Sequence, residues 1–299
     1  MTLLVVGGTS KVGRVLVPAA LATRQVRITT RDPQSAIARQ LAGAGAEVVQ
    51  ADLRDRASLT RALAGVTEVV AAAHGFPGNG DNDVESVDRA GHRNLIGAAR
   101  TAGALRFVYI SAVGAAPDHP VDLFRTKYEI EQALVNSDLE WTSLRATAFM
   151  EFWAAFVGQP VLDTGKTTVY GKGRNPINFV SAGDVARLAL TLLDDPMSIR
   201  EVVELGGPEN LSMDEVVDRF ALAAGRPPKV RHVPLRIMKM LRAAAGRVNP
   251  PLGRQVSAAI VMDTTPMTFD PAETLARWPM TLTSLDDIIA TLTRGPRQG

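Results

Sequence analysis

Leu3-Leu4-Val5-Val6-Gly7-Gly8-Thr9-Ser10-Lys11-Val12-Gly13-Arg14 joins an apolar run to a glycine-rich turn and a helix-forming segment. The apolar run predicts a buried strand, and the glycines predict a tight turn before the helix. In this order of elements the main chain can approach a phosphate closely, and free N–H groups at the helix N-terminus bind its charge. The stretch therefore predicts a pyrophosphate site, although Ser10 stands where a middle glycine is usual. The expected contacts are Gly7, Thr9, Ser10, Lys11, Val12 and Gly13.

Strand-like runs alternate with helical patterns through the first half of the chain. The expected strands cover residues 3–6, 26–30, 47–50, 68–73, 107–111 and 141–145. The expected helices cover residues 12–23, 34–42, 58–64, 84–102 and 123–136. This alternation, with strands that are apolar along their length, predicts an α/β fold with a doubly wound parallel sheet, the Rossmann fold. Ligands bind such sheets at the carboxyl ends of the strands.

The pattern changes after Arg145. The elements expected next are a helix at 149–157, a glycine-rich loop at 165–175, strands at 177–180 and 202–205, and a helix at 182–193. Both strands can return to the large sheet, and the chain after Gly206 reads as mostly helical. We therefore expect a Rossmann domain of residues 1–148, completed by 176–205. A smaller, mostly helical substrate or lid lobe is expected from residues 149–175 and 206–299.

Composition narrows the class of protein. A chain of 299 residues with 46% apolar residues can bury one large domain core and a smaller one. The absence of cysteine excludes disulfides and thiolate metal sites, and the four histidines lack metal-ligand spacing. No apolar run reaches membrane-spanning length. We expect no metal, no membrane span and no nucleic-acid partner, and a cytoplasmic location.

Charge is distributed unevenly along the chain. Residues 219–262 contain nine basic residues and no acidic residue, within a chain whose net charge is only +2. One interpretation is a surface for an acidic partner, an anionic substrate, a membrane face or a homodimer, with Leu235, Met238 and Leu241 as an apolar stripe between the cations. The other interpretation is a solvated helical face.

The ends of the second to fourth strands indicate which dinucleotide is bound. An NAD site prefers a carboxylate after the second strand, but this chain has Thr30 and Arg31 there, which suit a 2′-phosphate. The sequence therefore predicts NADP(H). Asp52 and Leu53 follow the third strand and suit the edge and face of adenine. Ala72 and Ala73 follow the fourth strand, and their small size lets the main chain pass close to a ribose.

These motifs resemble the NmrA-like group of atypical short-chain dehydrogenase/reductases. The resembling stretches are residues 7–14, 30–33, 51–57, 94–100, 107–114, 127–149 and 178–186. The resemblance implies a Rossmann-type fold, NADP(H) more often than NAD(H), and substrates such as quinones, dyes or natural-product intermediates. Residues 141–151 resemble the strand that passes the nicotinamide, which adds Phe149 to the expected cofactor contacts. Some members of the group bind nucleotide without catalysis, as redox sensors, assembly factors or structural subunits.

The wider superfamily uses a Tyr-x-x-x-Lys motif, in which one helical face carries both side chains. Lysine binds the nicotinamide ribose and lowers the tyrosine pKa, and tyrosine transfers the substrate proton. Lys127 matches the lysine, but Leu123 stands at the tyrosine position and cannot transfer a proton. Tyr128 is adjacent to Lys127 and therefore points about 100° away around the helix.

The remaining candidates are less specific. Ser111 matches a strand-end serine of the family that can bond a substrate oxygen or the nicotinamide amide, or it can simply form the turn. The proton could come from water, from the substrate or from a histidine, His74 or His119; of the two histidines, His74 is preferred because it follows a central strand. Phe76, Met150 and Trp153 are expected to line an apolar substrate pocket, or to belong to the ordinary core.

The sequence thus predicts an NADPH-dependent oxidoreductase that reduces a small apolar carbonyl, enone or quinone-like compound without the usual tyrosine. Hydride transfer needs the cofactor, orientation and a dry pocket more than it needs that acid. The alternative is a non-catalytic NADP(H)-binding sensor, assembly factor or structural subunit, which Leu123 also favours. A sugar-nucleotide isomerase is disfavoured because such enzymes need the acid–base pair.

Overall fold

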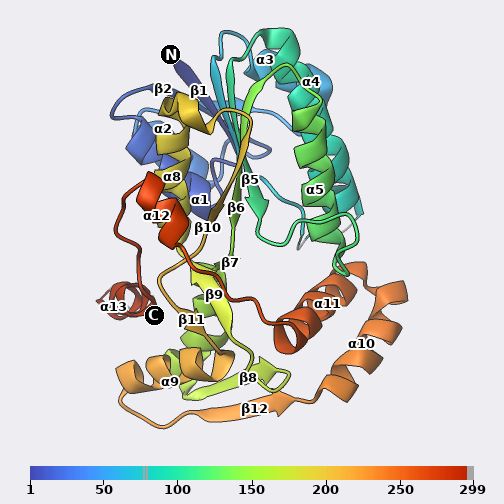
Figure 1. Ribbon diagram of the computed structural model, residues 1–299, viewed down its shortest axis with the longest axis vertical. Helices are drawn as coiled ribbons and strands as arrows, with labels where there is room; N and C mark the ends of the chain where they lie inside the picture. Colours follow the sequence, from blue (N-terminus) through green and yellow to red (C-terminus); the bar gives the residue numbers. More distant parts are fainter. Residues whose placement is uncertain (77, 79, 295–299) are drawn as a thin grey trace. The chain divides into compact units, whose positions relative to one another are not determined.

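The structure is a computed structural model that describes residues 1–76, 78 and 80–294, apart from the side chains of residues 245–248. The chain forms two compact units (Figure 1). Unit 1 comprises Met1–Ala146 and Ala182–Leu205, and unit 2 comprises Thr147–Ser181 and Gly206–Gly299.

Unit 1 is built on a seven-stranded parallel sheet, which confirms the predicted fold class. Its order is β10-β6-β5-β4-β1-β2-β3. The central strands are apolar along their length because helices cover both faces, and residues 3–6 of β1 are at most 2% exposed. The strands are β1 (Thr2–Val6), β2 (Gln25–Thr30), β3 (Glu47–Gln50), β4 (Glu68–Ala71), β5 (Arg106–Ala112), β6 (Glu140–Ala146) and β10 (Glu201–Leu205).

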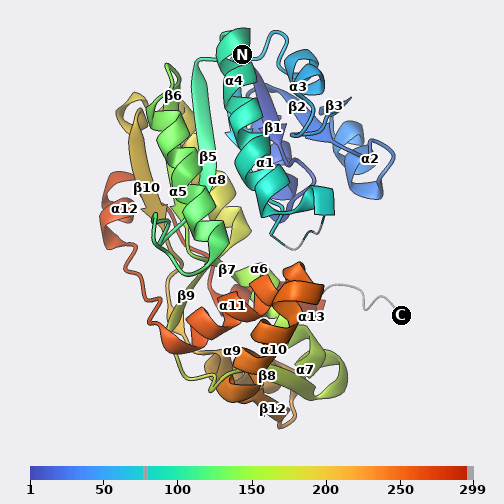
Figure 2. The ribbon, with the colours of Figure 1, turned by 90° about the vertical axis from the view of Figure 1, so that its right-hand side faces the viewer.

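The helices of unit 1 lie in two layers. α1 (Lys11–Ala20), α2 (Ala36–Gly43) and α8 (Ala182–Asp194) cover one face of the sheet, and α3 (Arg56–Ala62), α4 (His92–Ala102) and α5 (Asp122–Val135) cover the other (Figure 1). α4 and α5 lie side by side over the strands (Figure 2). The expected helix at 84–102 is divided, because a π-helical segment precedes α4. The short segments are η1 (Gly80–Asn82), the π-helix η2 (Val84–Gly91) and η4 (Pro196–Ser198).

Unit 2 combines two small sheets with helices. One sheet has the order β11-β9-β7, and the other pairs β12 with β8 in parallel. The strands are β7 (Ala148–Phe149), β8 (Lys166–Tyr170), β9 (Ile177–Val180), β11 (Asn210–Leu211) and β12 (Lys229–Val233). The helices are α6 (Met150–Trp153), the π-helix η3 (Ala154–Gly158), α7 (Gln159–Thr164), α9 (Met213–Ala224), α10 (Leu235–Val248), α11 (Pro250–Thr264), α12 (Ala272–Arg277) and α13 (Leu285–Arg294).

β9 corrects the expected organisation. Residues 177–180 were expected to return to the large sheet, but β9 pairs with β7 and β11 in unit 2. β10 alone takes the sheet edge beside β6. The buried amide of Asn178 explains the choice: its Oδ1 accepts hydrogen bonds from Thr147 Oγ1 at 2.9 Å and from Gly207 N at 2.7 Å. These partners all belong to unit 2, so the amide would lose them in the large sheet.

β8 is a second correction. The segment 165–175 was expected to be a loop because of its glycines, but residues 166–170 form a strand. Thr167 and Val169 are buried, whereas Lys166 and Tyr170 are exposed, which is the alternation of a strand with one solvated face. Its partner β12 also interrupts the expected run of helices after Gly206.

The basic segment 219–262 does not present the expected apolar stripe. Met238 is fully buried, and the exposed apolar residues of α10 include Ile237 and Met240 beside Leu241. Arg219 is paired with Glu209, so it contributes less free charge than its sequence context predicts. The side chain of Arg247, another member of the segment, lies outside the described residues.

Asn178→Leu should destabilise the protein by about 2–4 kcal/mol, because several buried partners would lose a hydrogen bond at once. Urea unfolding followed by circular dichroism measures the change. Asn136→Leu, on the exposed end of α5, is the matched control and should cost less than about 1 kcal/mol. A cost no larger than that of the control would contradict the role assigned to the amide.

Candidate functional site

The turn between β1 and α1 has a close approach that only glycine permits. Gly7 has φ +88°, and a Cβ there would lie 2.7 Å from Ala73 N and 2.9 Å from the carbonyl carbon of Ala72. A Cβ on Gly13 would lie 2.4 Å from the carbonyl oxygens of Gly7 and Gly8. The structure thus brings the predicted residues Gly7, Gly13, Ala72 and Ala73 together at the carboxyl ends of β1 and β4.

Ser10 fits the turn without strain. Its φ is −69°, so the missing glycine is tolerated, and its Oγ accepts a hydrogen bond from Gly13 N at 3.1 Å as the N-cap of α1. Within the described part of the chain, the main-chain N–H groups of Lys11 and Val12 have no hydrogen-bond acceptor. They are the groups that an anion at a helix N-terminus would use, and Thr9 lies half-buried beside them.

The carboxyl ends of β2 and β3 carry a cluster of charges. Arg31 is exposed, and its guanidinium donates to Asn82 Oδ1, while Thr30 Oγ1 accepts a 3.2 Å hydrogen bond from Asp32 N. Asp52 is held by Arg54, whose Nε lies 2.9 Å from Asp52 Oδ1. This hydrogen bond lowers the pKa of Asp52, and the charge of Arg31 contributes in the same direction.

Sequence reasoning missed Arg54, although it stands only two residues after the predicted contact Asp52. It adds a second cation beside Arg31 and also donates to the carbonyl oxygen of Asp81 at 2.8 Å. Leu53 is only 8% exposed and belongs to the core beneath α3 and α4, so little of its side chain is available to a ligand.

Lys127 is the buried cation of the site. Its Nζ donates to the carbonyl oxygen of Ile110 at 2.9 Å and lies 4.7 Å from the centroid of the Tyr109 ring. Burial lowers the pKa of Lys127, and the negative charges of Asp88 and Glu131 oppose that shift. Leu123 stands one helical turn earlier and is half-buried, so α5 offers an ammonium donor but no hydroxyl beside it.

Asp88 and His92 were also missed. Asp88 is fully buried; its Oδ2 accepts from Gly75 N at 2.7 Å, and its Oδ1 lies 4.0 Å from Lys127 Nζ. His92 is fully buried with its ring 5.2 Å from that of Tyr109, and burial, assisted by the charge of Lys127, lowers its pKa to about 4. The sequence signal was an aspartate and a histidine four residues apart on the otherwise apolar face of residues 84–95.

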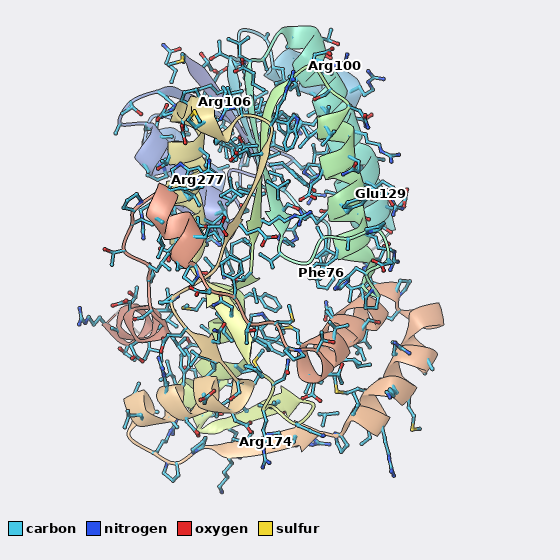
Figure 3. All side chains as sticks on the ribbon, in the orientation of Figure 1. Phe76, Arg100, Arg106, Glu129, Arg174 and Arg277 are labelled. Atoms are coloured by element: carbon cyan, nitrogen blue, oxygen red, sulfur yellow. The ribbon has the colours of Figure 1, made fainter. Side chains whose placement is uncertain are left out.

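The other sequence candidates occupy different environments. Ser111 is buried at the carboxyl end of β5, and its hydroxyl has no partner among the described residues. His74 follows β4 and is exposed, whereas Phe76, labelled in Figure 3, is half-buried in the same segment. His119 Nδ1 accepts from Val121 N at 3.1 Å, which gives it a role in the turn.

The unit 2 candidates lie on β7 and α6. Met150 is 3% exposed and sits in the core of unit 2, against which the half-buried Trp153 packs. Phe149 is half-buried. Phe152 and Phe156, which the sequence analysis did not select, are the more exposed aromatic residues of this region, at 47% and 45%.

The side-chain clusters and the helices can be described for residues 1–76, 78 and 80–294. There, no group of three or more histidine, aspartate or glutamate side chains is arranged to hold a metal ion. No helix within the same residues has the length and apolar character needed to cross a membrane.

Three features define a dinucleotide-binding protein of the Rossmann class. They are the glycine turn before α1, its close approach to the segment after β4, and the buried Lys127 at the end of the sheet. The chain belongs to the NmrA-like family, whose model matches residues 1–267.

The chain is similar to two curated relatives and to one solved structure. The chain is 32% identical over 253 residues to an NAD(P)H azoreductase of Xenophilus azovorans, covering 83% of this chain and 82% of the relative. It is 27% identical over 248 residues to the photosystem II assembly factor Ycf39 of Guillardia theta, covering 82% and 77%. The structure of an NADPH-dependent quinone oxidoreductase of Escherichia coli with NADPH superposes with a TM-score of 0.78, at 23% identity, covering 97% and 99%. That last similarity shows the fold.

Gly13→Ala should destabilise unit 1 by about 1–3 kcal/mol, because its Cβ would overlap two carbonyl oxygens. Thermal unfolding measures the effect. Gly97→Ala is the matched control: it also lies in a helix, but its Cβ would meet only Arg56 Nη2 at 3.6 Å. The control should be neutral or stabilising by up to about 1 kcal/mol. Equal effects of the two substitutions would contradict the close approach.

Proposed function

We propose that the protein is an NADPH-dependent reductase of a small apolar carbonyl, enone or quinone-like compound. The observation that carries the proposal is the glycine cradle of Gly7 and Gly13 at the same end of the sheet as Lys127. The pyrophosphate would bind the N–H groups of Lys11 and Val12, with Thr9 and Ser10 beside it. Thr30 and Arg31 would hold the 2′-phosphate, with Arg54 as a further cation.

The proposed contacts with the adenine and the ribose are the residues that the sequence predicted at the ends of β3 and β4. Asp52 would border the adenine, and Ala72 and Ala73 would let the main chain pass the ribose. Phe76, which follows β4 in the same unit as the glycine turn, would border the substrate.

The chemistry divides between cofactor and protein. When bound, the nicotinamide supplies the hydride. Lys127 would bind the nicotinamide ribose and orient the ring, and Ser111 would donate its unpartnered hydroxyl to a substrate or amide oxygen. With Leu123 at the tyrosine position, the face of α5 one turn before Lys127 has no proton donor. A substrate whose reduced form spreads its negative charge, such as a quinone or an enone, therefore fits best, with His74 or water delivering the proton.

The azoreductase relative supports a reductase that uses a nicotinamide cofactor. The assembly-factor relative supports the second candidate, a protein that binds NADP(H) without turnover. Leu123 is the observation in this chain that favours the second candidate. An acidic partner or a second copy at the basic segment 219–262 would belong to that function.

NADPH should raise the melting temperature more than NADH does. Arg31→Ala should weaken NADPH binding by about 1.5–3 kcal/mol, the range for hydrogen bonds to charged groups, and leave NADH binding nearly unchanged. Thermal shift and isothermal titration calorimetry measure both. Arg39→Ala, an exposed arginine on α2, is the matched control and should change neither. Equal protection by NADH and NADPH would refute the assignment of Arg31.

The reductase proposal is tested by turnover. Purified protein with NADPH should oxidise the cofactor in the presence of some members of a panel of quinones, enones and azo dyes, followed by nicotinamide absorbance. Lys127→Met should reduce the rate at least about tenfold, since it removes the ribose-binding ammonium. Tight NADPH binding without oxidation across the panel would favour the non-catalytic function.

A further inference from the structure

Asp88 occupies a position that the proposed mechanism leaves unexplained. It is a fully buried carboxylate on the π-helix η2, a type of segment that is rare and concentrates at functional sites. One oxygen is bonded to Gly75 N at 2.7 Å, and the other makes no hydrogen bond within the described residues. Burial of a carboxylate is costly unless it is paired with a charge or well hydrogen-bonded.

The free oxygen of Asp88 is directed to Lys127. The 4.0 Å separation from Lys127 Nζ is an ion-pair distance in a place where both side chains are at most 8% exposed. Electrostatic attraction is stronger there than in water, because little solvent screens it. Asp88 therefore joins three elements: its own helix η2, the segment after β4 through Gly75, and α5 through Lys127.

The other groups around Lys127 do not replace this carboxylate. From β5, Lys127 meets the Ile110 carbonyl oxygen and the Tyr109 ring, both uncharged. From α4 it faces His92, and from the segment after β4 it faces His74, whose cationic forms would repel it. Glu131 on α5 is a second negative charge, but Arg145 binds it through both carboxylate oxygens.

We propose that Asp88 is a positioning residue of the dinucleotide site, which keeps Lys127 charged and fixes it beside the main chain at Gly75. The inference rests on the proposed function, in which Lys127 binds the nicotinamide ribose. It adds that the carboxylate on η2 sets the pH range over which the lysine can do so. Asp88 acts through Lys127 and has no contact with substrate of its own.

The test is the pH dependence of NADPH binding in Asp88→Asn. The amide keeps an acceptor for Gly75 N but removes the negative charge, so Lys127 should lose its proton at lower pH. The dissociation constant for NADPH should then rise at least about tenfold between about pH 6.5 and pH 9 in the variant, and less in the wild type, since tenfold corresponds to one pKa unit. Calorimetry at each pH measures it.

Two controls make the result specific. Glu129→Gln removes a carboxylate from α5 that pairs with Arg89 and is 36% exposed; it should retain the wild-type pH profile (Figure 3). In a Lys127→Met background, Asp88→Asn should have no further effect on NADPH binding. An equal loss of affinity with and without Lys127, or a wild-type pH profile in Asp88→Asn, would overturn the proposal.

Stability provides a second measurement that does not need the cofactor. Asp88→Asn alone leaves a buried ammonium without its partner, which is strongly destabilising, whereas Asp88→Asn with Lys127→Met removes both charges. The double variant should therefore melt at a higher temperature than Asp88→Asn. A double variant that is no more stable than Asp88→Asn would overturn the proposal. Because neither readout uses turnover, NADPH binding without reduction would defeat the reductase function and leave this inference standing.

Discussion

The close approach of the β1–α1 turn to the segment after β4 is the constraint on which the rest of the site depends. Gly7 brings two stretches of main chain so near that a methyl group would lie within 3 Å of the Ala72–Ala73 backbone. That contact sets where α1 begins and which N–H groups point to the carboxyl edge of the sheet. Parallel order then delivers the ends of β2, β3, β4 and β5 to the same edge.

The buried lysine depends on this arrangement in turn. Lys127 comes from α5, yet its ammonium lies against β5 and near a carboxylate from η2. Each of these groups would be unfavourable alone in a nearly dry place, and together they neutralise one another. The surroundings of Lys127 are thus held by charge pairing, whereas the turn between β1 and α1 is held by main-chain geometry.

The arrangement of strands in unit 2 depends on hydrogen bonds of a buried side chain. The strand at 177–180 was predicted, but its place was not. A buried amide, Asn178, links β9 to the chain on both sides through hydrogen bonds to Thr147 and Gly207. Relatives of the chain include an NAD(P)H azoreductase and a photosystem II assembly factor. In this chain the close approach at Gly7 and Gly13 is well defined, and Leu123, one turn before Lys127, carries no group that transfers a proton.

Local sequence determined the strand–turn–helix order of residues 2–20, the parallel sheet of unit 1 and the place of Lys127 on its helix, because each depends on residues that lie close together in the sequence. Apolar continuity, glycine spacing and one-turn helical spacing act over a few positions. That Ser10 fits the turn in place of a glycine follows from its negative φ, which is a property of the folded chain. Tertiary structure alone decided that 177–180 belongs to unit 2, that Arg54 joins Arg31, and that Asp88 faces Lys127. The reason is physical: these outcomes depend on hydrogen bonds and charges between residues far apart in the chain, such as Asp88 and Lys127, which are 39 positions apart, and no local pattern encodes their distances.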